Sequence, residues 1–216
     1  MKKRALKKFD LTMLLTTLIC LLPIVLSLFL YDSLPETVAV HFDGEGHPDG
    51  YAPRWVAAFA LPMGMALLNL LVHFGLNTDP KRENSSKVVR NLGKWLIPVI
   101  TVILVPVTLF MALGYDFPLE IFIPALLGII FIVAGNYLPK SRQNYTVGIK
   151  LPWTLDSEEN WNKTHRLAGY LWIAGGLLMV VSSFLRAAGT PLMLTAIGIM
   201  VIIPVVYSYL LYRRGI

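Results

Sequence analysis

Six long apolar runs constrain the fold of this 216-residue chain more than any other feature. They lie near residues 11–31, 55–76, 94–115, 119–138, 168–187 and 191–212. Each run has about the twenty residues that an α-helix needs to cross roughly 30 Å of hydrocarbon. Only helices and closed barrels satisfy every backbone polar group inside a bilayer, and runs of this length favour helices. The sequence therefore predicts an all-α integral membrane protein with six transmembrane helices.

The composition supports this class, because 56% of the residues are hydrophobic and only 15% are charged. The first apolar run follows a basic start, MKKRALKK, and so imitates a secretory signal. However, no small-x-small cleavage site follows the run. We therefore expect an uncleaved first helix.

The positive charges indicate how the chain crosses the membrane. Of the 19 Lys and Arg residues, 17 fall in residues 1–10, 77–94, 139–167 and 213–216, and the others are Arg54 and Arg186. The positive-inside rule then places both termini in the cytoplasm. We expect a multi-pass membrane protein that contacts the lipid bilayer. The net charge of +6 is explained by this topology, so no direct nucleic-acid partner is predicted.

Three loops are long enough to hold a site: residues 32–54 outside, and residues 77–93 and 139–167 inside. The remaining two connections, at residues 116–118 and 188–190, are predicted to be tight turns between antiparallel helices.

The outer loop begins with an apolar and polar alternation over residues 38–43 and continues into a segment rich in Gly and Pro. This pattern predicts a short extended arm and a folded-back turn. His41, Asp43, His47 and Asp49 have the side chains to surround a divalent ion. Carboxylates beside turn glycines more often bond to backbone N–H groups. The turn role is favoured, so no bound metal and no cofactor are predicted. If a metal were bound, His41, Asp43, His47 and Asp49 would be its candidate ligands.

The inner loop holds the most varied stretch, GNYLPKSRQNYTVGIKLPWTLDSEENWNKTH, at residues 135–165. Its Asn, Thr and Tyr side chains can satisfy the polar groups of irregular backbone. The spacing Asp156-x-x-Glu159 predicts a capping box that opens a helix running into the fifth span. Trp161 is then expected at the level of the lipid headgroups.

A catalytic interpretation would make His165 a base oriented by Asp156, Glu158 or Glu159. Asp156 is nine residues away, too far to pair along one helix, and no HExxH, GxSxG or Gly-rich phosphate motif is present. No enzymatic activity is therefore predicted.

Basic residues of the inner loop allow two interpretations. They could form a clamp for phosphate or headgroups, or only satisfy the topology rule, which is favoured. The residues concerned are Lys140, Arg142, Lys150, Lys163 and Arg166.

Asn69 and His73 stand four residues apart in the second span and so share a helix face. They indicate either a hydrogen bond between helices or a pathway for a small solute or ion. A transporter using them is one alternative function, and a membrane metalloenzyme using the outer-loop His and Asp residues is another.

Two stretches show a resemblance to known families. The stretch from Gly135 to Gly169 resembles the C-terminal signature of the SdpI family of bacterial immunity proteins, and Leu34–Trp55 looks like DUF1648. The resemblance implies a DUF1648-like region over residues 1–76 and an SdpI-like region over residues 77–216. It also implies a place in the bacterial cytoplasmic membrane, protection against a secreted peptide toxin, and signalling through capture of a small helix-turn-helix autorepressor.

The resemblance and the loop chemistry together give the predicted ligand-binding residues. In the outer loop they are His41, Asp43, Gly46, Asp49, Tyr51 and Arg54. In the inner loop they are Asn136, Lys140, Asn144, Gly148, Pro152, Trp153, Thr154, Trp161, His165 and Arg166.

Overall fold

The computed structural model describes residues 10–216, apart from the side chains of residues 186–188. Within this part of the chain, six helices are long and apolar enough to cross a membrane, as the sequence predicted. These spans are Leu11–Ser33, Val56–Thr78, Lys87–Ala112, Leu119–Lys140, Glu158–Ser182 and Gly189–Arg213.

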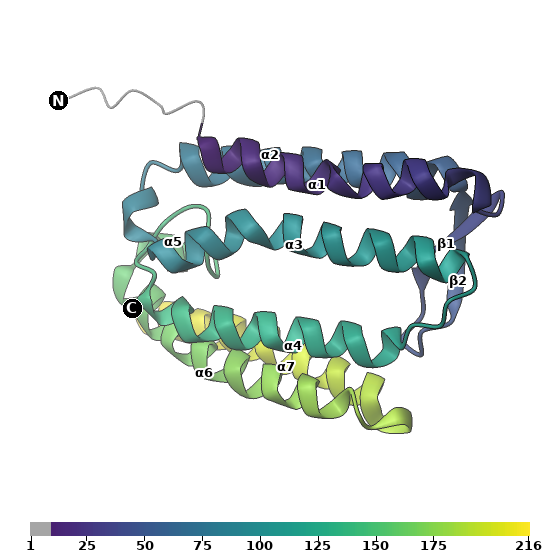
Figure 1. The fold of residues 1–216 in the computed structure, drawn as a ribbon. Helices are drawn as coiled ribbons and strands as arrows, with labels where there is room; N and C mark the ends of the chain where they lie inside the picture. Colours follow the sequence, from purple (N-terminus) through teal and green to yellow (C-terminus); the bar gives the residue numbers. More distant parts are fainter. Residues whose placement is uncertain (1–9) are drawn as a thin grey trace. The chain divides into compact units, whose positions relative to one another are not determined.

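The chain forms two compact units that interleave in sequence. The first contains residues up to Thr78 together with Asn91–Pro118, and the second contains Asp79–Arg90 and Leu119–Ile216. In Figure 1 the helices of both units are labelled and coloured by residue number. Two connections that are far apart in sequence, residues 79–86 and 138–157, therefore belong to the same unit.

The first unit is built from α1 (Leu11–Leu30), α2 (Leu61–Thr78) and the part of α3 (Lys87–Ala112) that follows residue 90. Asp10 caps α1 by accepting a hydrogen bond from the Thr12 N–H at 3.1 Å. The apolar core of the unit contains four buried residues: Leu34, Ala58, Val105 and Leu109.

Polar side chains join α1 and α2 within this unit. Thr16 Oγ lies 2.9 Å from His73 Nε2 and accepts a bond from Asn69 Nδ2 at 3.0 Å. Asn69 also donates to Thr17 Oγ at 3.0 Å. Asn69 and His73 are fully buried. The pair therefore makes the interhelical hydrogen bonds that were one of its two predicted roles.

A two-stranded antiparallel sheet adds a β element to the predicted all-α fold. β1 (Thr37–Phe42) pairs with β2 (Pro48–Pro53), with irregular register around His41. The sequence predicted the extended arm and the turn, but it gave no sign of the returning strand. β2 contains Pro, Asp and Gly, which are depleted in strands, so the partner strand and not local propensity determines its conformation.

The second unit packs α6 (Glu158–Ser182) between α4 (Leu119–Tyr137) and α7 (Arg186–Arg213) (Figure 1). Met179, Ala196 and Met200 form its buried apolar core. Glycines bring the backbones of α4 and α6 together. A Cβ on Gly128 would lie 2.6 Å from the Gly176 carbonyl oxygen.

Two predicted boundaries need correction. α3 begins at Lys87 and not near residue 94, because its first two turns carry Arg90 and Lys94 and are too polar for an apolar window to include. The turn between α6 and α7 lies at residues 183–185 and not at residues 188–190. Ser182 and Ser183 bond back to carbonyls of their own last turn, where α6 ends.

The glycine contact gives a stability prediction. Gly128→Ala should destabilise the protein by about 1–3 kcal/mol, because overpacking forces the two backbones apart. The matched control is Gly198→Ala in α7, where a Cβ would meet nothing within 4 Å. Thermal unfolding of both variants in the same detergent measures the difference, and equal melting temperatures would contradict the contact.

Candidate functional site

The tip of the β1–β2 hairpin is an Asp-centred turn. The Asp43 carboxylate accepts the backbone N–H groups of Glu45 at 2.8 Å and His47 at 2.9 Å. Gly46 has φ +86°, a conformation that favours glycine. Asp43 and Gly46 therefore have the turn-forming role that the sequence favoured over a metal role.

The four metal candidates form two separate pairs on this hairpin. His41 Nδ1 lies 2.5 Å from Asp49 Oδ1, and His47 Nδ1 lies 3.5 Å from Asp43 Oδ2. All four side chains are exposed. Among residues 10–216, no group of three or more His, Cys, Asp or Glu side chains is placed to hold a metal ion.

Arg54 and Tyr51 differ in how far they are available to a ligand. Arg54 donates to the carbonyls of Tyr31 and Leu34, each at 3.3 Å, and its guanidinium lies 4.7 Å from the centre of the Tyr31 ring. Arg54 thus fixes the base of the hairpin to the end of α1. Tyr51 is 63% exposed and leaves its ring accessible.

The hairpin turn should respond to acid. The backbone N–H of His47 is the main cause that lowers the pKa of Asp43 below its ordinary value of 3.8. Because the pKa of Asp43 is lower in the folded turn, the ionised carboxylate stabilises the turn fully above pH 3.8. This stabilisation is lost as the pH falls through the pKa of the folded state. Amide exchange protection at Glu45 and His47 should therefore fall below about pH 3.8.

Asp43→Asn is the control for this effect, because its amide oxygen accepts the same bonds without titrating. Protection in this variant should stay nearly constant over the same pH range. A wild-type turn that kept full protection at pH 2 would contradict the role of the carboxylate.

The second unit carries a folded polar segment that we call the inner platform, made of residues 79–86 and 141–157. Asp79 joins its two parts. The Asp79 carboxylate accepts the N–H groups of Lys81 at 2.7 Å and Tyr145 at 3.0 Å, and the Thr146 hydroxyl at 2.5 Å. Asp79 is only 7% exposed. Both predicted inner loops therefore lie on the same side of this unit.

Gln143 extends this connection. Its side chain accepts from Lys81 Nζ at 2.6 Å and donates to the carbonyls of Thr154 at 3.1 Å and Leu155 at 2.8 Å. Its backbone carbonyl accepts from Asn84 Nδ2 at 2.8 Å. Each polar atom of the Gln143 side chain thus bonds to the platform.

Asn144 and Thr154 shape the irregular backbone locally. Asn144 Oδ1 accepts the N–H groups of Thr146 at 3.0 Å and Val147 at 2.7 Å. Thr154 Oγ accepts the Leu151 N–H at 2.9 Å and opens the short helix α5 (Pro152–Asp156). Both side chains are fully buried. They supply the backbone partners that the sequence predicted for this loop.

His165 and Trp161 support the loop from α6. Ile149 donates its N–H to His165 Nε2 at 2.9 Å, so this nitrogen carries no proton, and Nδ1 donates to the Trp161 carbonyl at 2.7 Å. The Trp161 and His165 rings stack at 3.9 Å. Gly148 has φ +117° and faces both rings, and a Cβ there would collide with them. His165 is therefore a neutral structural residue with both nitrogens in use.

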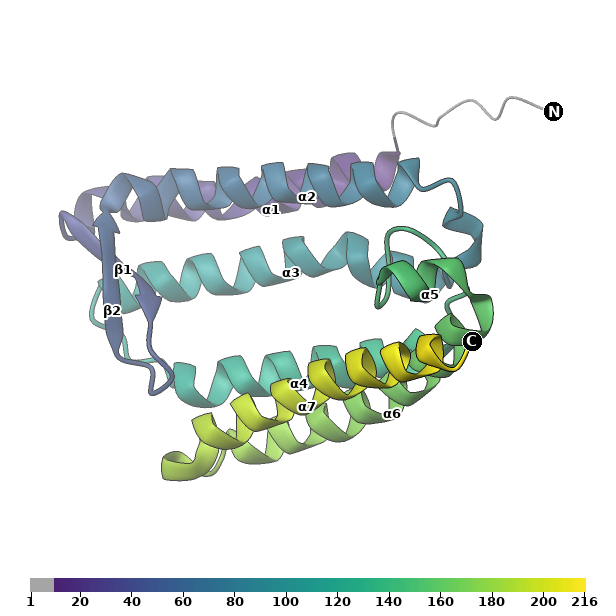
Figure 2. The same ribbon diagram turned by 180° about the vertical axis from the view of Figure 1, so that it is seen from behind.

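Trp153 connects α5 to the end of α7. Its Nε1 donates to Ser208 Oγ at 2.9 Å, and its ring packs against Tyr209 and Tyr212. Figure 2 shows α5 beside the C-terminal turns of α7. The short helix is thereby fixed to the bundle.

Several details of the platform differ from the predictions. Trp161 is fully buried and donates to the Ser141 carbonyl at 2.8 Å, so its ring packs inside the protein and does not face lipid headgroups. The residue that caps α6 is Ser157 and not Asp156, because Ser157 Oγ accepts the Asn160 N–H at 3.2 Å. Residues 152–156 are helical, where irregular backbone was predicted.

Most of the predicted inner-loop residues fall into two groups by exposure, and Gly148 and Trp153 are half-buried. Asn144, Thr154, Trp161 and His165 are buried and hold the platform together. The exposed residues are Asn136, Lys140, Pro152 and Arg166. The prediction missed Asp79 and Gln143, and the only local signal was the Asp79-Pro80 pair directly after α2.

Removing the Asp79 charge should loosen the platform. In Asp79→Asn the side-chain NH₂ group takes the place of one carboxylate oxygen, so a donor that bonded to that oxygen loses its acceptor. A buried polar group without a partner costs about 1–3 kcal/mol. Hydrogen exchange of residues 141–151 should become faster in this variant. The control is Asp156→Asn, which changes an exposed carboxylate on the same platform. Equal exchange in the two variants would contradict the role of Asp79.

Comparison with known proteins finds one family match over the hairpin and another that includes most of the inner platform. Residues 140–208 match the SdpI/YfhL protein family, and residues 18–66 match a domain of unknown function, DUF1648. The chain is also 26% identical to the immunity protein SdpI of Bacillus subtilis (strain 168), over 93% of this chain and 95% of that protein. No solved structure matches the chain.

Proposed function

We propose that this bacterial membrane protein, which matches the SdpI/YfhL protein family over residues 140–208, protects its cell against a secreted antimicrobial peptide. The observation that carries the proposal is the similarity to an immunity protein along 93% of the chain. That similarity includes both the hairpin and the inner platform. The proposal assigns no catalytic role to either.

The hairpin is the surface that we assign to the toxin. Tyr51 presents an exposed aromatic ring, a side chain that often dominates the energy of binding interfaces. The His41–Asp49 pair adds exposed polar groups to the same hairpin. Arg54 anchors the base of the hairpin through its hydrogen bonds to the Tyr31 and Leu34 carbonyls, and this role does not require contact with the ligand.

The platform is the surface that we assign to a cytoplasmic partner, a small helix-turn-helix autorepressor. Pro152 is an exposed residue of the platform and Arg166 is an exposed residue of α6, and the buried side chains of the platform are hydrogen-bonded. For a signal to cross the membrane, the toxin must favour one of two arrangements of this surface. α6 runs without interruption from the platform at Glu158 into the bundle at Ser182 and offers the mechanical connection.

A survival assay tests the immunity role. A Bacillus subtilis strain that lacks its own SdpI should survive beside its toxin-producing parent when it expresses this chain. Tyr51→Ala should raise toxin sensitivity about tenfold if the ring contributes on the order of 1.4 kcal/mol to binding. The control is Tyr170→Ala in α6, whose ring is 64% exposed and belongs to the other unit.

Membrane levels of each variant, measured by immunoblot, separate loss of binding from loss of protein. Absence of protection by the wild-type chain at normal membrane levels would refute the immunity role for this toxin. Equal protection by Tyr51→Ala and Tyr170→Ala would refute the assignment of the toxin surface to the hairpin.

A further inference from the structure

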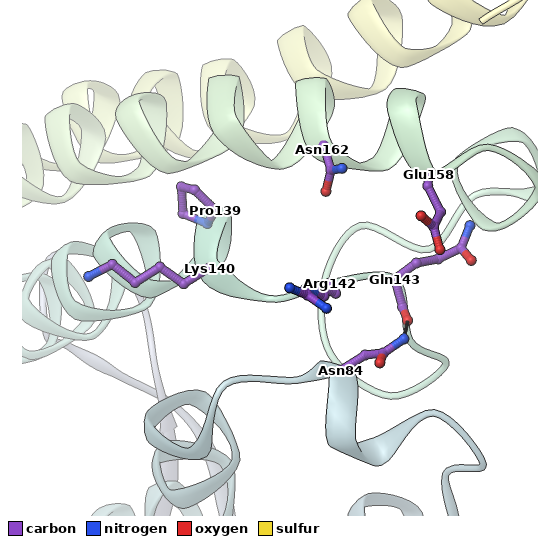
Figure 3. Close-up of a pocket in the computed structure, with 7 residues that line it drawn as sticks. All are labelled: Asn84, Pro139, Lys140, Arg142, Gln143, Glu158 and Asn162. Carbon is purple, nitrogen blue, oxygen red and sulfur yellow. Dashed lines mark hydrogen bonds between the residues drawn. The ribbon is translucent and has the colours of Figure 1, made fainter.

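The second unit contains a polar pocket that the platform and the proposed function leave unused. It has a volume of about 370 Å³, within the range of about 300–1,000 Å³ that is typical of small-ligand sites. Figure 3 shows its lining, which includes Asn84, Arg142, Glu158 and Asn162. Two helix ends and both parts of the platform thus meet around one pocket.

The pocket lies where two predicted membrane spans end. Lys140 closes the span Leu119–Lys140, and Glu158 opens the span Glu158–Ser182. The aromatic cluster of Trp153, Tyr209 and Tyr212 belongs to the same unit, where it joins α5 to the C-terminal turns of α7. Such residues concentrate at the boundary between membrane and water. The pocket therefore lies beside the ends of two candidate membrane spans.

Two opposite charges line the pocket without neutralising each other. The Arg142 guanidinium and the Glu158 carboxylate make no hydrogen bond or ion pair with the described residues. Lys140 also lines the pocket, but its ammonium is turned away and lies 4.5 Å from the centre of the Tyr137 ring (Figure 3). The groups left for a ligand are one cation and one anion.

The neutral lining is fixed before any ligand arrives. Gln143 is held by Lys81 and by two carbonyls of α5, and Asn84 donates to the Gln143 carbonyl (Figure 3). Asn162 extends from α6 toward the same space (Figure 3). A planar guanidinium matches phosphate oxygens in a bidentate manner, and amide N–H groups add further donors. A carboxylate instead suits an ammonium group and repels a second anion.

We propose that this pocket binds a lipid headgroup that combines a phosphodiester with a primary ammonium, as in phosphatidylethanolamine. Arg142 holds the phosphate, with the amides of Asn84 and Asn162 beside it, and Glu158 holds the ammonium. A purely anionic headgroup would satisfy Arg142 but would meet the Glu158 carboxylate. The bound lipid would join the end of α4 to the start of α6.

Native mass spectrometry of the delipidated full chain in detergent tests this assignment. Dioleoylphosphatidylethanolamine should bind about tenfold more tightly than dioleoylphosphatidylglycerol. Arg142→Gln should weaken binding of the ethanolamine lipid about tenfold, because it removes a charge-assisted hydrogen-bonding group. Glu158→Gln should abolish the preference for ethanolamine over glycerol.

Matched controls come from the same unit. Arg214→Gln removes an exposed arginine outside the pocket, and Glu159→Gln removes the neighbouring carboxylate, which pairs with Lys163. Both should keep wild-type affinity and preference. The melting temperature of each lipid-free variant shows whether it is folded. If Arg142→Gln melts at a lower temperature than the wild type, Arg142→Lys replaces it in the test. This variant keeps the positive charge but loses the planar guanidinium, so it should bind the lipid with intermediate affinity.

Competition distinguishes the source of the phosphate. Soluble O-phosphoethanolamine should displace the lipid, and inorganic phosphate at the same concentration should not. Equal competition by the two would overturn the headgroup assignment in favour of a free phosphate site. Unchanged lipid affinity in Arg142→Gln, or equal affinity of the wild type for the two lipids, would overturn the proposed pocket chemistry.

Discussion

Irregular backbone beside a bilayer must find hydrogen-bond partners within the protein, and the inner platform depends on this constraint. Asp79, Gln143, Asn144, Thr154 and His165 each accept or donate bonds to backbone groups of the platform. Without these partners, every unpaired N–H or carbonyl would carry a desolvation cost. The varied residue types of this stretch are therefore explained by the number of differently placed backbone groups that they satisfy.

The same constraint explains why His165 and Trp161 are structural. The two rings stack, and each bonds to a backbone group through a ring nitrogen. A histidine whose nitrogens are both engaged has no free site for proton transfer or metal binding. What remains for recognition is the exposed surface, where Pro152 and Arg166 lie, and the pocket beside Arg142 and Glu158.

Close packing of α4 and α6 gives the platform a firm base. Gly128 and Gly135 of α4 face Gly176 and Gly169 of α6 so closely that side chains would not fit between them. Membrane helices gain little from apolar burial against each other, because lipid tails are equally apolar, and so depend on such close contact. The hairpin of the first unit is organised differently. Its turn is self-contained around Asp43, and most of its candidate side chains remain exposed.

Sequence alone determined the features that depend on local chemistry. Apolar run length gave the six spans, and the Asp-Gly pattern gave the hairpin turn. The sequence also indicated that the loops at 77–93 and 139–167 share a side, because Lys and Arg gather in alternate loops. Each of these signals is carried by neighbouring residues and needs no distant partner.

Only the tertiary structure decided which side chains meet. Asp79 lies 66 residues before Tyr145, and no local pattern predicts the bond between them. Trp161 has the residue type of a headgroup anchor, yet it is buried because His165, Gly148 and the Ser141 carbonyl surround it. Arg142 and Glu158 come to one pocket because α4 and α6 pack side by side. Burial and pairing depend on contacts across the fold, which the spacing of residues along the chain does not record.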